Sequence, residues 1–371
     1  MAAKHPESAR LLAYDCLTPF GDVAETHRAL CEGRRALAPV PVLGSRGGDP
    51  VPLALMPGRG LDEAPLPHWL GGIRGLAARI PGGDWGRPGR PIVVTSSNFG
   101  VGSLYSYRHD GGDPSHLGHG APFSSVEWLR CELGWGADIT VFSHACVSAH
   151  LGLVHAARLL ARGLADEVLV FSYDFLSPFV AGGFHALKIL NGQMPAPYRR
   201  QETGSIALGD GAAFAVLTRD RGEHQLVAQS LFNELHHFTA NKADGSGFAS
   251  VLEGLREAAG GRRLWLKGHG TGTLEAGRLE AESLGRCFPG SPLVGWKGSL
   301  GHTLGSCGLV ELAIATEALR RGQAPGTVGT EGPCFIDEVA TAPFATGGFD
   351  AVLCSSNAFG GAHAALLLAH A

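Results

Sequence analysis

The chain has 371 residues, enough for one large domain or two, and only 17% of them are charged. Because this fraction is below the roughly 25% of an average soluble protein, we expect much of the surface to be buried in a core or a subunit interface. The net charge of -4, from 30 basic and 34 acidic residues, lacks the basic excess of proteins that bind nucleic acids or anionic membranes.

The N-terminal sequence has no apolar run of signal-peptide length. No run of about 18 apolar residues is free of Arg, His or Asp, so we expect no membrane span. The eight cysteines include no CxxC pair, which favours free thiols over a disulfide framework. The sequence therefore predicts a cytoplasmic protein.

Residues 40–90 are rich in Pro and Gly and predict loops, with one short helix near 70–80. A buried strand is predicted at 91–97, ending in a glycine turn at 99–102, and a loop at 108–122. The first half continues with strands at 139–142, 167–173 and 212–218 and a helix at 148–162 that closes at Gly163.

The second half repeats this rhythm. It predicts strands at 226–233, 264–267, 293–296, 351–356 and 364–369, and helices at 248–259, 279–287 and 307–321. The strands are apolar throughout, as expected when helices cover both faces of a sheet. Two similar halves indicate a duplicated α/β unit.

Cys146, in the segment FSHACVSAH, follows one predicted strand and begins a predicted helix. Free N–H groups and the helix dipole at such a position favour a thiolate. The alternative is a small buried apolar side chain, which is the usual state of a free cysteine.

Three glycine-rich segments also follow strands: KGHGTGT at 267–273, WKGSLGHTLG at 296–305 and NAFGGAH at 357–363. Each is also compatible with an ordinary turn. The first matches neither the Walker pattern nor GxGxxG with a distant acid, which disfavours nucleotide binding. The paired histidines at 116/119 and 236/237 lack ligands at zinc spacing, so no metal site is predicted.

In this order, ACVS, HGTGT, KGSLGHTLG and FGG resemble the motifs of the elongating β-ketoacyl-ACP synthases, condensing enzymes of the thiolase-like superfamily. LTPFG and GSIALGDGAAFAVL extend the resemblance, which covers about 11–369 and is weakest at 25–90. It implies an α/β fold, a thiolase-like duplicated α/β/α/β/α five-layer sandwich. Residues 1–220 would form the half with the nucleophilic cysteine, and residues 221–371 the half with both catalytic histidines.

The resemblance also implies roles for individual residues. Cys146 corresponds to the nucleophile, His269 and His302 to the two catalytic histidines, and Lys297 to the active-site lysine. Glu280 and Glu311 correspond to the two acids that support that lysine. Thr271 and Thr273 correspond to two threonines that contact the pantetheine arm of the substrate. Phe359 corresponds to a gating phenylalanine, whose N–H joins that of Cys146 in an oxyanion hole.

The implied activity is decarboxylative Claisen condensation of an acyl thioester with malonyl-ACP, through an acyl-cysteine intermediate, in fatty-acid, polyene or polyketide elongation. The implied partners are an acyl carrier protein, whose phosphopantetheine carries the acyl groups, and a second subunit in a homodimer or ketosynthase-like heterodimer. No other cofactor is expected. The alternative is a non-catalytic subunit like the chain-length factors, which typically lack the cysteine.

The chain departs from the family pattern at several positions. Gly277 and Arg278 replace Asp and Pro after HGTGT, and Asp210 stands where Glu is usual. His363 stands where the FGG loop usually continues toward Asn.

Overall fold

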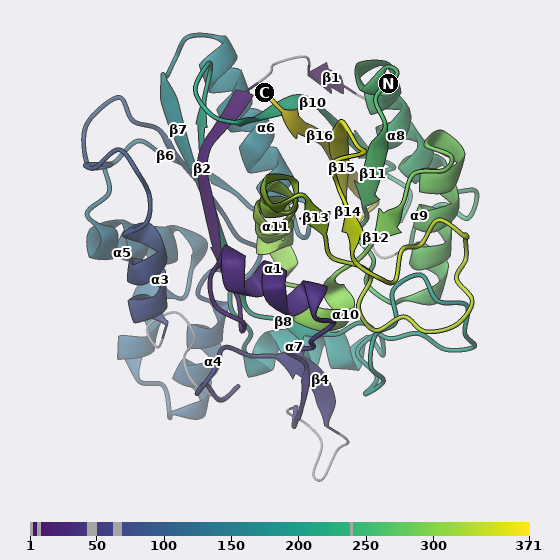
Figure 1. The fold of residues 1–371 in the computed structure, drawn as a ribbon. Helices are drawn as coiled ribbons and strands as arrows, with labels where there is room; N and C mark the ends of the chain where they lie inside the picture. The colour runs from purple at the N-terminus through teal and green to yellow at the C-terminus, as the bar shows by residue number, and fades with distance from the viewer. Residues whose placement is uncertain (1–2, 6–8, 43–49, 62–68, 238–239) are drawn as a thin grey trace.

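The computed structural model describes residues 3–5, 9–42, 50–61, 69–237 and 240–371. In these residues a sheet of eleven strands runs through the molecule (Figure 1). Its first half has the order β6–β5–β7–β9–β2. These strands are β2 (Ala9–Leu17), β5 (Ile92–Thr95), β6 (Ile139–Phe142), β7 (Glu167–Asp174) and β9 (Gly211–Thr218).

The second half has the order β12–β11–β15–β16–β10 and repeats the first. In each half three neighbouring strands are parallel, and the next two are antiparallel. The halves join where β10 pairs with β2, and β1 (Ala3–His5) also pairs with β10. The strands are β10 (His224–Asn233), β11 (Leu264–Lys267), β12 (Leu293–Val294), β15 (Ala351–Ala358) and β16 (Ala362–His370).

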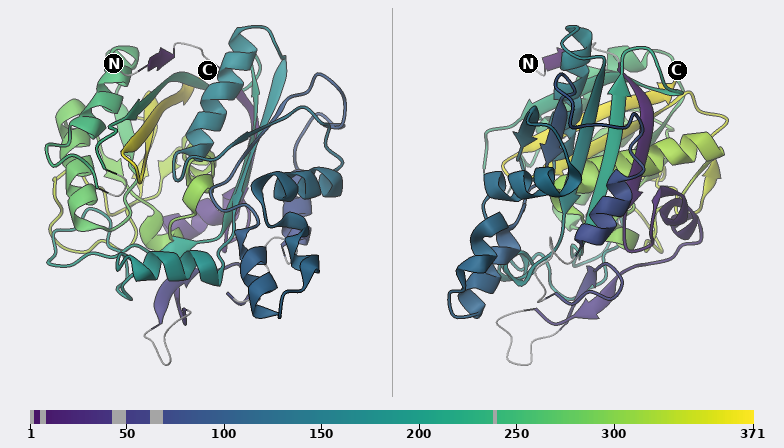
Figure 2. Two further views of the ribbon diagram at one scale, coloured as in Figure 1. Left: turned by 180° about the vertical axis from the view of Figure 1, so that it is seen from behind. Right: turned by 90° about the vertical axis from the view of Figure 1, so that its left-hand side faces the viewer.

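The two halves of the sheet form two layers of the molecule, and helices form the other three (Figure 2). Helices α6 (Ser148–Ala161) and α11 (Cys307–Arg321) lie between the two halves of the sheet. Helices α3 (Leu70–Ala77) and α5 (Pro122–Leu133) cover the outer face of the first half, and α8 (Ser246–Ala259) and α9 (Leu274–Cys287) that of the second. The repeated strand order and the five layers confirm the predicted fold class, while the boundary at residue 220 stays a prediction.

The burial of α11 explains its sequence. All residues from Cys307 to Leu319 are buried, so the helix is apolar on every side rather than along one stripe. The strands β7 and β9 are likewise buried along nearly their whole length, as their unbroken apolar sequences predicted.

Several elements differ from the sequence prediction. The expected turn at 99–102 begins α4 (Val101–His109), and the expected loop at 108–122 contains the 3-10 helix η1 (Pro114–His119). Helix α9 begins five residues before the predicted 279. Helices α1 (Val23–Cys31) and α7 (Pro178–Ala186) were not predicted, although α1 has a capping box of Asp22 and Glu25.

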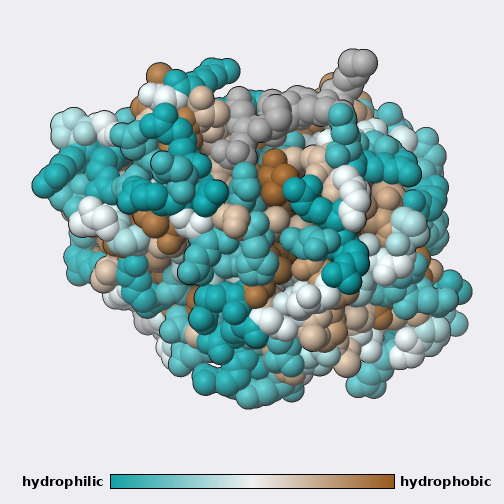
Figure 3. Space-filling model, turned by 45° about the horizontal axis from the view of Figure 1, so that its top comes forward, coloured by the Kyte–Doolittle hydropathy of each residue, from teal (hydrophilic) through white to brown (hydrophobic). Residues whose placement is uncertain are grey.

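The remaining elements are short. They are β3 (Ala38–Val40), β4 (Val51–Ala54), β8 (Leu208–Gly209), α10 (Lys297–Leu300), η2 (Leu304–Ser306), β13 (Gln323–Ala324) and β14 (Phe344–Ala345). No helix within the described ranges has the length and hydropathy needed to cross a membrane. All eight cysteines are free. Hydrophilic side chains dominate the face shown in Figure 3.

A buried ion pair ties the segment that follows β4 to the end of β8. Arg59 Nη1 lies 2.6 Å from Asp210 Oδ2, and both side chains are fully buried. The amides of Met56 and Leu176 also donate to the Asp210 carboxylate, at 2.9 and 2.7 Å. This acid replaces the family's Glu and holds three segments together.

We expect Asp210→Ala to lower the free energy of unfolding by about 3–5 kcal/mol, because it leaves the Arg59 charge buried without its carboxylate. Urea unfolding followed by circular dichroism measures this change. Glu253→Ala is the control, since it breaks an exposed pair with Arg256 and should change the free energy by less than about 0.5 kcal/mol. Equal effects of the two substitutions would show that the buried pair of Arg59 and Asp210 does not stabilise the fold in this way.

Candidate active site

Cys146 lies in a tight turn between β6 and α6. Ala145 has a φ of 45°, a left-handed conformation that residues with a side chain rarely adopt. The Ser148 hydroxyl donates to the Ala145 carbonyl at 2.7 Å and accepts from the His144 amide at 2.8 Å. These bonds hold the strained turn and fix the position of the Cys146 side chain.

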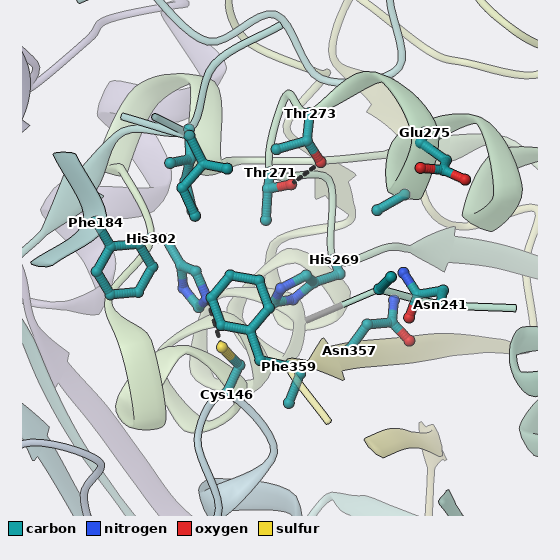
Figure 4. Close-up of a pocket in the computed structure, with 15 residues that line it drawn as sticks. Cys146, Phe184, Asn241, His269, Thr271, Thr273, Glu275, His302, Asn357 and Phe359 are labelled. Atoms are coloured by element: carbon teal, nitrogen blue, oxygen red, sulfur yellow. Dashed lines mark hydrogen bonds between the residues drawn. The ribbon is translucent and has the colours of Figure 1, made fainter. Parts of the chain in front are cut away.

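The Cys146 side chain faces a cavity of about 260 Å³ (Figure 4). His269 and His302 lie at the same end of the cavity. Apolar walls come from Phe184, Ile189, Ile206 and Phe359, and polar groups from Thr271, Thr273, Asn241 and Asn357. A mainly apolar cavity with a few polar groups suits an acyl chain on a polar carrier arm.

Cys146, His269 and His302 come from three separate loops and meet closely. His302 Nε2 lies 2.9 Å from Cys146 Sγ. The two imidazole rings are 4.9 Å apart between centroids and nearly perpendicular, at 87°. One atom from each of the three side chains lies within 4.8 Å of those from the other two.

A backbone hydrogen bond fixes the tautomer of His302. The Leu304 amide donates to His302 Nδ1 at 3.1 Å, so Nδ1 carries no proton in the neutral ring. The proton is therefore on Nε2, the nitrogen that faces Cys146. A neutral His302 is thus a hydrogen-bond donor toward the cavity and not an acceptor for the thiol proton.

The electrostatics favour two neutral imidazoles. Burial, followed by the charge of Lys297, lowers the pKa of His302 and of His269 well below the ordinary value. Burial also raises the pKa of the Cys146 thiol, and Lys297 only partly opposes this effect. The thiolate expected from the helix dipole is therefore a wrong prediction for the resting site, because Cys146 precedes α6 by two residues and is desolvated.

Lys297 lies next to the backbone of His269 and is almost completely buried. Its Nζ donates to the His269 carbonyl at 2.8 Å and to Glu311 Oε1 at 2.6 Å. The other oxygen of Glu311 accepts from Lys267, a second buried lysine, which begins the segment KGHGTGT and to which the sequence motifs gave no role. The burial of Lys267 could have been predicted from its place at the end of the apolar strand LWLK, because such a strand is buried in a sheet that helices cover on both faces.

Glu280 forms no ion pair with Lys297, but its charge adds to that of Glu311 in raising the pKa of this lysine against the effect of burial. Its carboxylate accepts from the amides of His269 and Gly270, at 2.6 and 2.9 Å. It also accepts from the Tyr198 hydroxyl at 3.0 Å and from Asn357 Nδ2 at 2.8 Å. Glu280 therefore orders the backbone of the HGTGT loop, while Glu311 neutralises the lysines.

The other predicted residues line the cavity. The Thr271 and Thr273 hydroxyls lie 3.0 Å apart, and the Phe359 ring stacks on Phe184 at 6.0 Å (Figure 4). Their roles stay predictions. In the described part of the chain Cys146, His269 and His302 form the one group with metal-ligand spacing, but the ammonium groups of Lys267 and Lys297 repel a cation there.

Comparisons with known proteins find similar sequences and similar folds. Residues 224–331 match the family "Beta-ketoacyl synthase, C-terminal domain". The tetracenomycin polyketide synthase ketoacyl synthase alpha subunit of Streptomyces glaucescens is 30% identical over 67% of this chain and 64% of its own length. The 3-oxoacyl-[acyl-carrier-protein] synthase 2 of Coxiella burnetii is 27% identical over 63% of this chain and 62% of its own length.

The fold extends the similarity beyond the matched sequence. A chain from the complex of a ketosynthase with its chain length factor, from Xenorhabdus doucetiae, superimposes with a TM-score of 0.78. It is 21% identical, and the match covers 99% of both chains. The chain matches less than two thirds of the length of the curated relatives, at 64% and 62%. Its sequence and its thiolase-like fold together show that the chain belongs to the β-ketoacyl synthase family.

Proposed function

We propose that the protein condenses an acyl thioester with malonyl-ACP, with loss of carbon dioxide, through an acyl group carried on Cys146. One observation carries the proposal: His302 Nε2–H points at Cys146 Sγ from 2.9 Å, and the Leu304 amide fixes its tautomer. His269 and His302 then provide two neutral donors beside one nucleophile. This is the arrangement that decarboxylative condensation needs.

In the first step Cys146 Sγ attacks the carbonyl carbon of the acyl thioester. The amides of Cys146 and Phe359 hold the tetrahedral oxyanion, and the carrier thiolate leaves. The proton of the Cys146 thiol passes to this leaving thiolate. The acyl group then stays on Cys146 while a malonyl thioester enters.

In the second step the bond between the malonyl carboxylate and the α-carbon breaks, and carbon dioxide leaves. The electron pair forms an enolate, whose oxygen accepts hydrogen bonds from His269 and His302. The α-carbon then attacks the acyl-Cys146 carbonyl. The new carbon–carbon bond releases the Cys146 thiolate, which takes up a proton.

The proposed partners follow from the chemistry of the substrates. An acyl carrier protein would present its phosphopantetheine arm past Thr271 and Thr273, and no further cofactor is needed for the steps above. The proposed products are elongated fatty-acid, polyene or polyketide chains. With eight free cysteines, the proposed compartment is the reducing cytoplasm.

The second candidate is a non-catalytic subunit that pairs with an active ketosynthase. The similar fold of a chain from the complex of a ketosynthase with its chain length factor supports this second candidate. The complete set of Cys146, His269, His302 and Lys297 favours catalysis instead, since a subunit without chemistry has no use for a buried lysine and two donors around a thiol.

The two half-reactions should separate in two variants. We expect Cys146→Ala to form no acyl-enzyme but still to release carbon dioxide from malonyl carrier protein. We expect His302→Ala to keep the acyl mass shift but to lose about 10²–10³ of the decarboxylation rate, because one donor to the enolate is gone. Intact-mass spectrometry and carbon dioxide release measure the two reactions. Wild-type decarboxylation by His302→Ala, or an acyl adduct on Cys146→Ala, would refute these roles.

In Lys267→Met, the fall of the decarboxylation rate on the acid side of the pH–rate profile should begin at a higher pH. The charge of Lys267 lowers the pKa of His302, so its removal raises that pKa. Protonation of Nδ1 then begins at higher pH and breaks the hydrogen bond from Leu304. The pH–rate profiles of Lys267→Met and of the exposed control Lys188→Met are compared, and superimposable profiles would show that Lys267 has no such effect.

We also propose a dimer that forms along β6, the strand at one edge of the sheet. Val141 in this strand is 40% exposed, and an unpaired edge favours association with a second chain. Light scattering at micromolar concentration should give the mass of two chains, and Val141→Lys should weaken the dimer. An active wild-type monomer under these conditions would contradict this prediction.

A further inference from the structure

His363 on β16 is part of a buried polar path that the proposed mechanism does not use. Its Nδ1 lies 2.8 Å from Asn357 Oδ1, and its Nε2 lies 2.8 Å from Glu234 Oε1. The side chains of His363 and Glu234 are fully buried. The Phe248 ring packs against the imidazole, with 4.5 Å between centroids. A polar path in such a place specifies geometry, because each unmet hydrogen bond is costly.

One end of the path reaches the catalytic loop. Asn357 Nδ2 donates to Glu280 Oε1 at 2.8 Å. Glu280 in turn holds the amides of His269 and Gly270. Asn357 also lines the cavity. The orientation of Asn357 therefore affects both Glu280 and the cavity wall.

The other end reaches a second segment of the cavity wall, and Asn241 of this segment lies near Asn357 (Figure 4). Glu234 Oε2 accepts from the Lys242 amide at 2.8 Å, and the neighbouring Asn241 lines the cavity. The Glu234 amide donates to the Gly361 carbonyl at 2.8 Å, in the loop that carries Phe359. A Cβ on Gly247 would lie only 1.8 Å from Glu234 Oε1, so this carboxylate is closely packed.

The hydrogen bonds determine where protons must lie. Asn357 directs its Nδ2 to the Glu280 carboxylate, so its Oδ1 faces His363 and requires a donor there. His363 Nδ1 must then carry a proton. Burial lowers the pKa of the His363 imidazole, and the hydrogen bond to Glu234 opposes this shift. The 2.8 Å contact between Nε2 and Glu234 Oε1 completes the path on the other side of the ring.

We propose that His363 is a positioning residue for the condensation, which joins the HGTGT loop to the wall segment Ala240–Lys242 through Asn357 and Glu234. This inference rests on the proposed function, because the two walls it joins are those that would hold the carrier-bound substrate. His363 touches neither Cys146 nor the reacting atoms. Its loss should therefore affect substrates on the carrier arm more than the reactivity of the thiol.

The experiment compares His363→Leu, which has no polar groups, with His363→Gln, whose amide can donate to Asn357 and bond to Glu234. We expect His363→Leu to raise the KM for acylation by acyl carrier protein at least about tenfold, as small displacements of positioning groups do. His363→Gln should restore most of this loss. Alkylation of Cys146 by iodoacetamide should keep its wild-type rate in both variants.

The matched control is His370→Leu, an exposed histidine on the same strand, which should keep the wild-type KM. Hydrogen exchange followed by mass spectrometry is measured on the same proteins. It should be faster in peptides that include Ala240–Lys242 and Gly268–Thr273 for His363→Leu only. If His363→Leu does not fold, Glu234→Ala cuts the same path and should give the same two changes.

Two outcomes would overturn the inference. One is a folded His363→Leu with wild-type KM and wild-type exchange in both segments. The other is a folded His363→Gln that is as impaired as His363→Leu, since the hydrogen bonds would then not be the cause. Failure of the proposed function gives a different result, because wild-type protein would itself form no acyl-Cys146, while the exchange measurement would still test the path.

Discussion

The shared carboxylate of Glu311 is the constraint on which the site depends. Two ammonium groups, those of Lys267 and Lys297, are buried next to the cavity and both bond to this one side chain. Burying a charge without a partner costs several kcal/mol, so the site requires an acid at this depth. Helix α11 supplies it, because α11 lies between the two halves of the sheet and directly follows the loop of His302. The charges lower the pKa of the histidines without leaving the lysines unpaired.

The rigidity of the surrounding layers allows strained backbone at the reacting groups. Ala145, before Cys146, has a φ of 45°, and Leu304, after His302, has a φ of 54°. Such conformations cost about 1–3 kcal/mol each and persist only where the surroundings determine them fully. Both strained residues lie next to the central helices α6 and α11. The strained Leu304 is also the residue whose N–H donates the hydrogen bond that sets the tautomer of His302. The packing of the middle layer therefore affects the protonation of His302 through the backbone.

Much of the fold was predictable because it rests on local apolar patterns. The strand LWLK and the helix from Cys307 to Arg321 have the predicted bounds, since their burial on all sides leaves an unbroken apolar signal. Helices α4 and α7 were missed because glycines and a proline obscure their periodicity. The hydrogen-bond partners of Glu280 also could not be predicted from the sequence. An acid eleven residues after His269 can face either a lysine or the loop amides, and the path of α9 decides between them.

The sequence by itself determined the fold class and singled out the candidate residues of the site, since ordered motifs and apolar runs are local properties of the chain. It also predicted that Cys146 and the two histidines lie in loops of a duplicated α/β unit. Only the tertiary structure decided their protonation, the sharing of Glu311 by two lysines, and the path from Glu280 through His363 to Glu234. The physical reason is that pKa values and hydrogen bonds depend on burial and on distances of a few ångström between residues far apart in the chain.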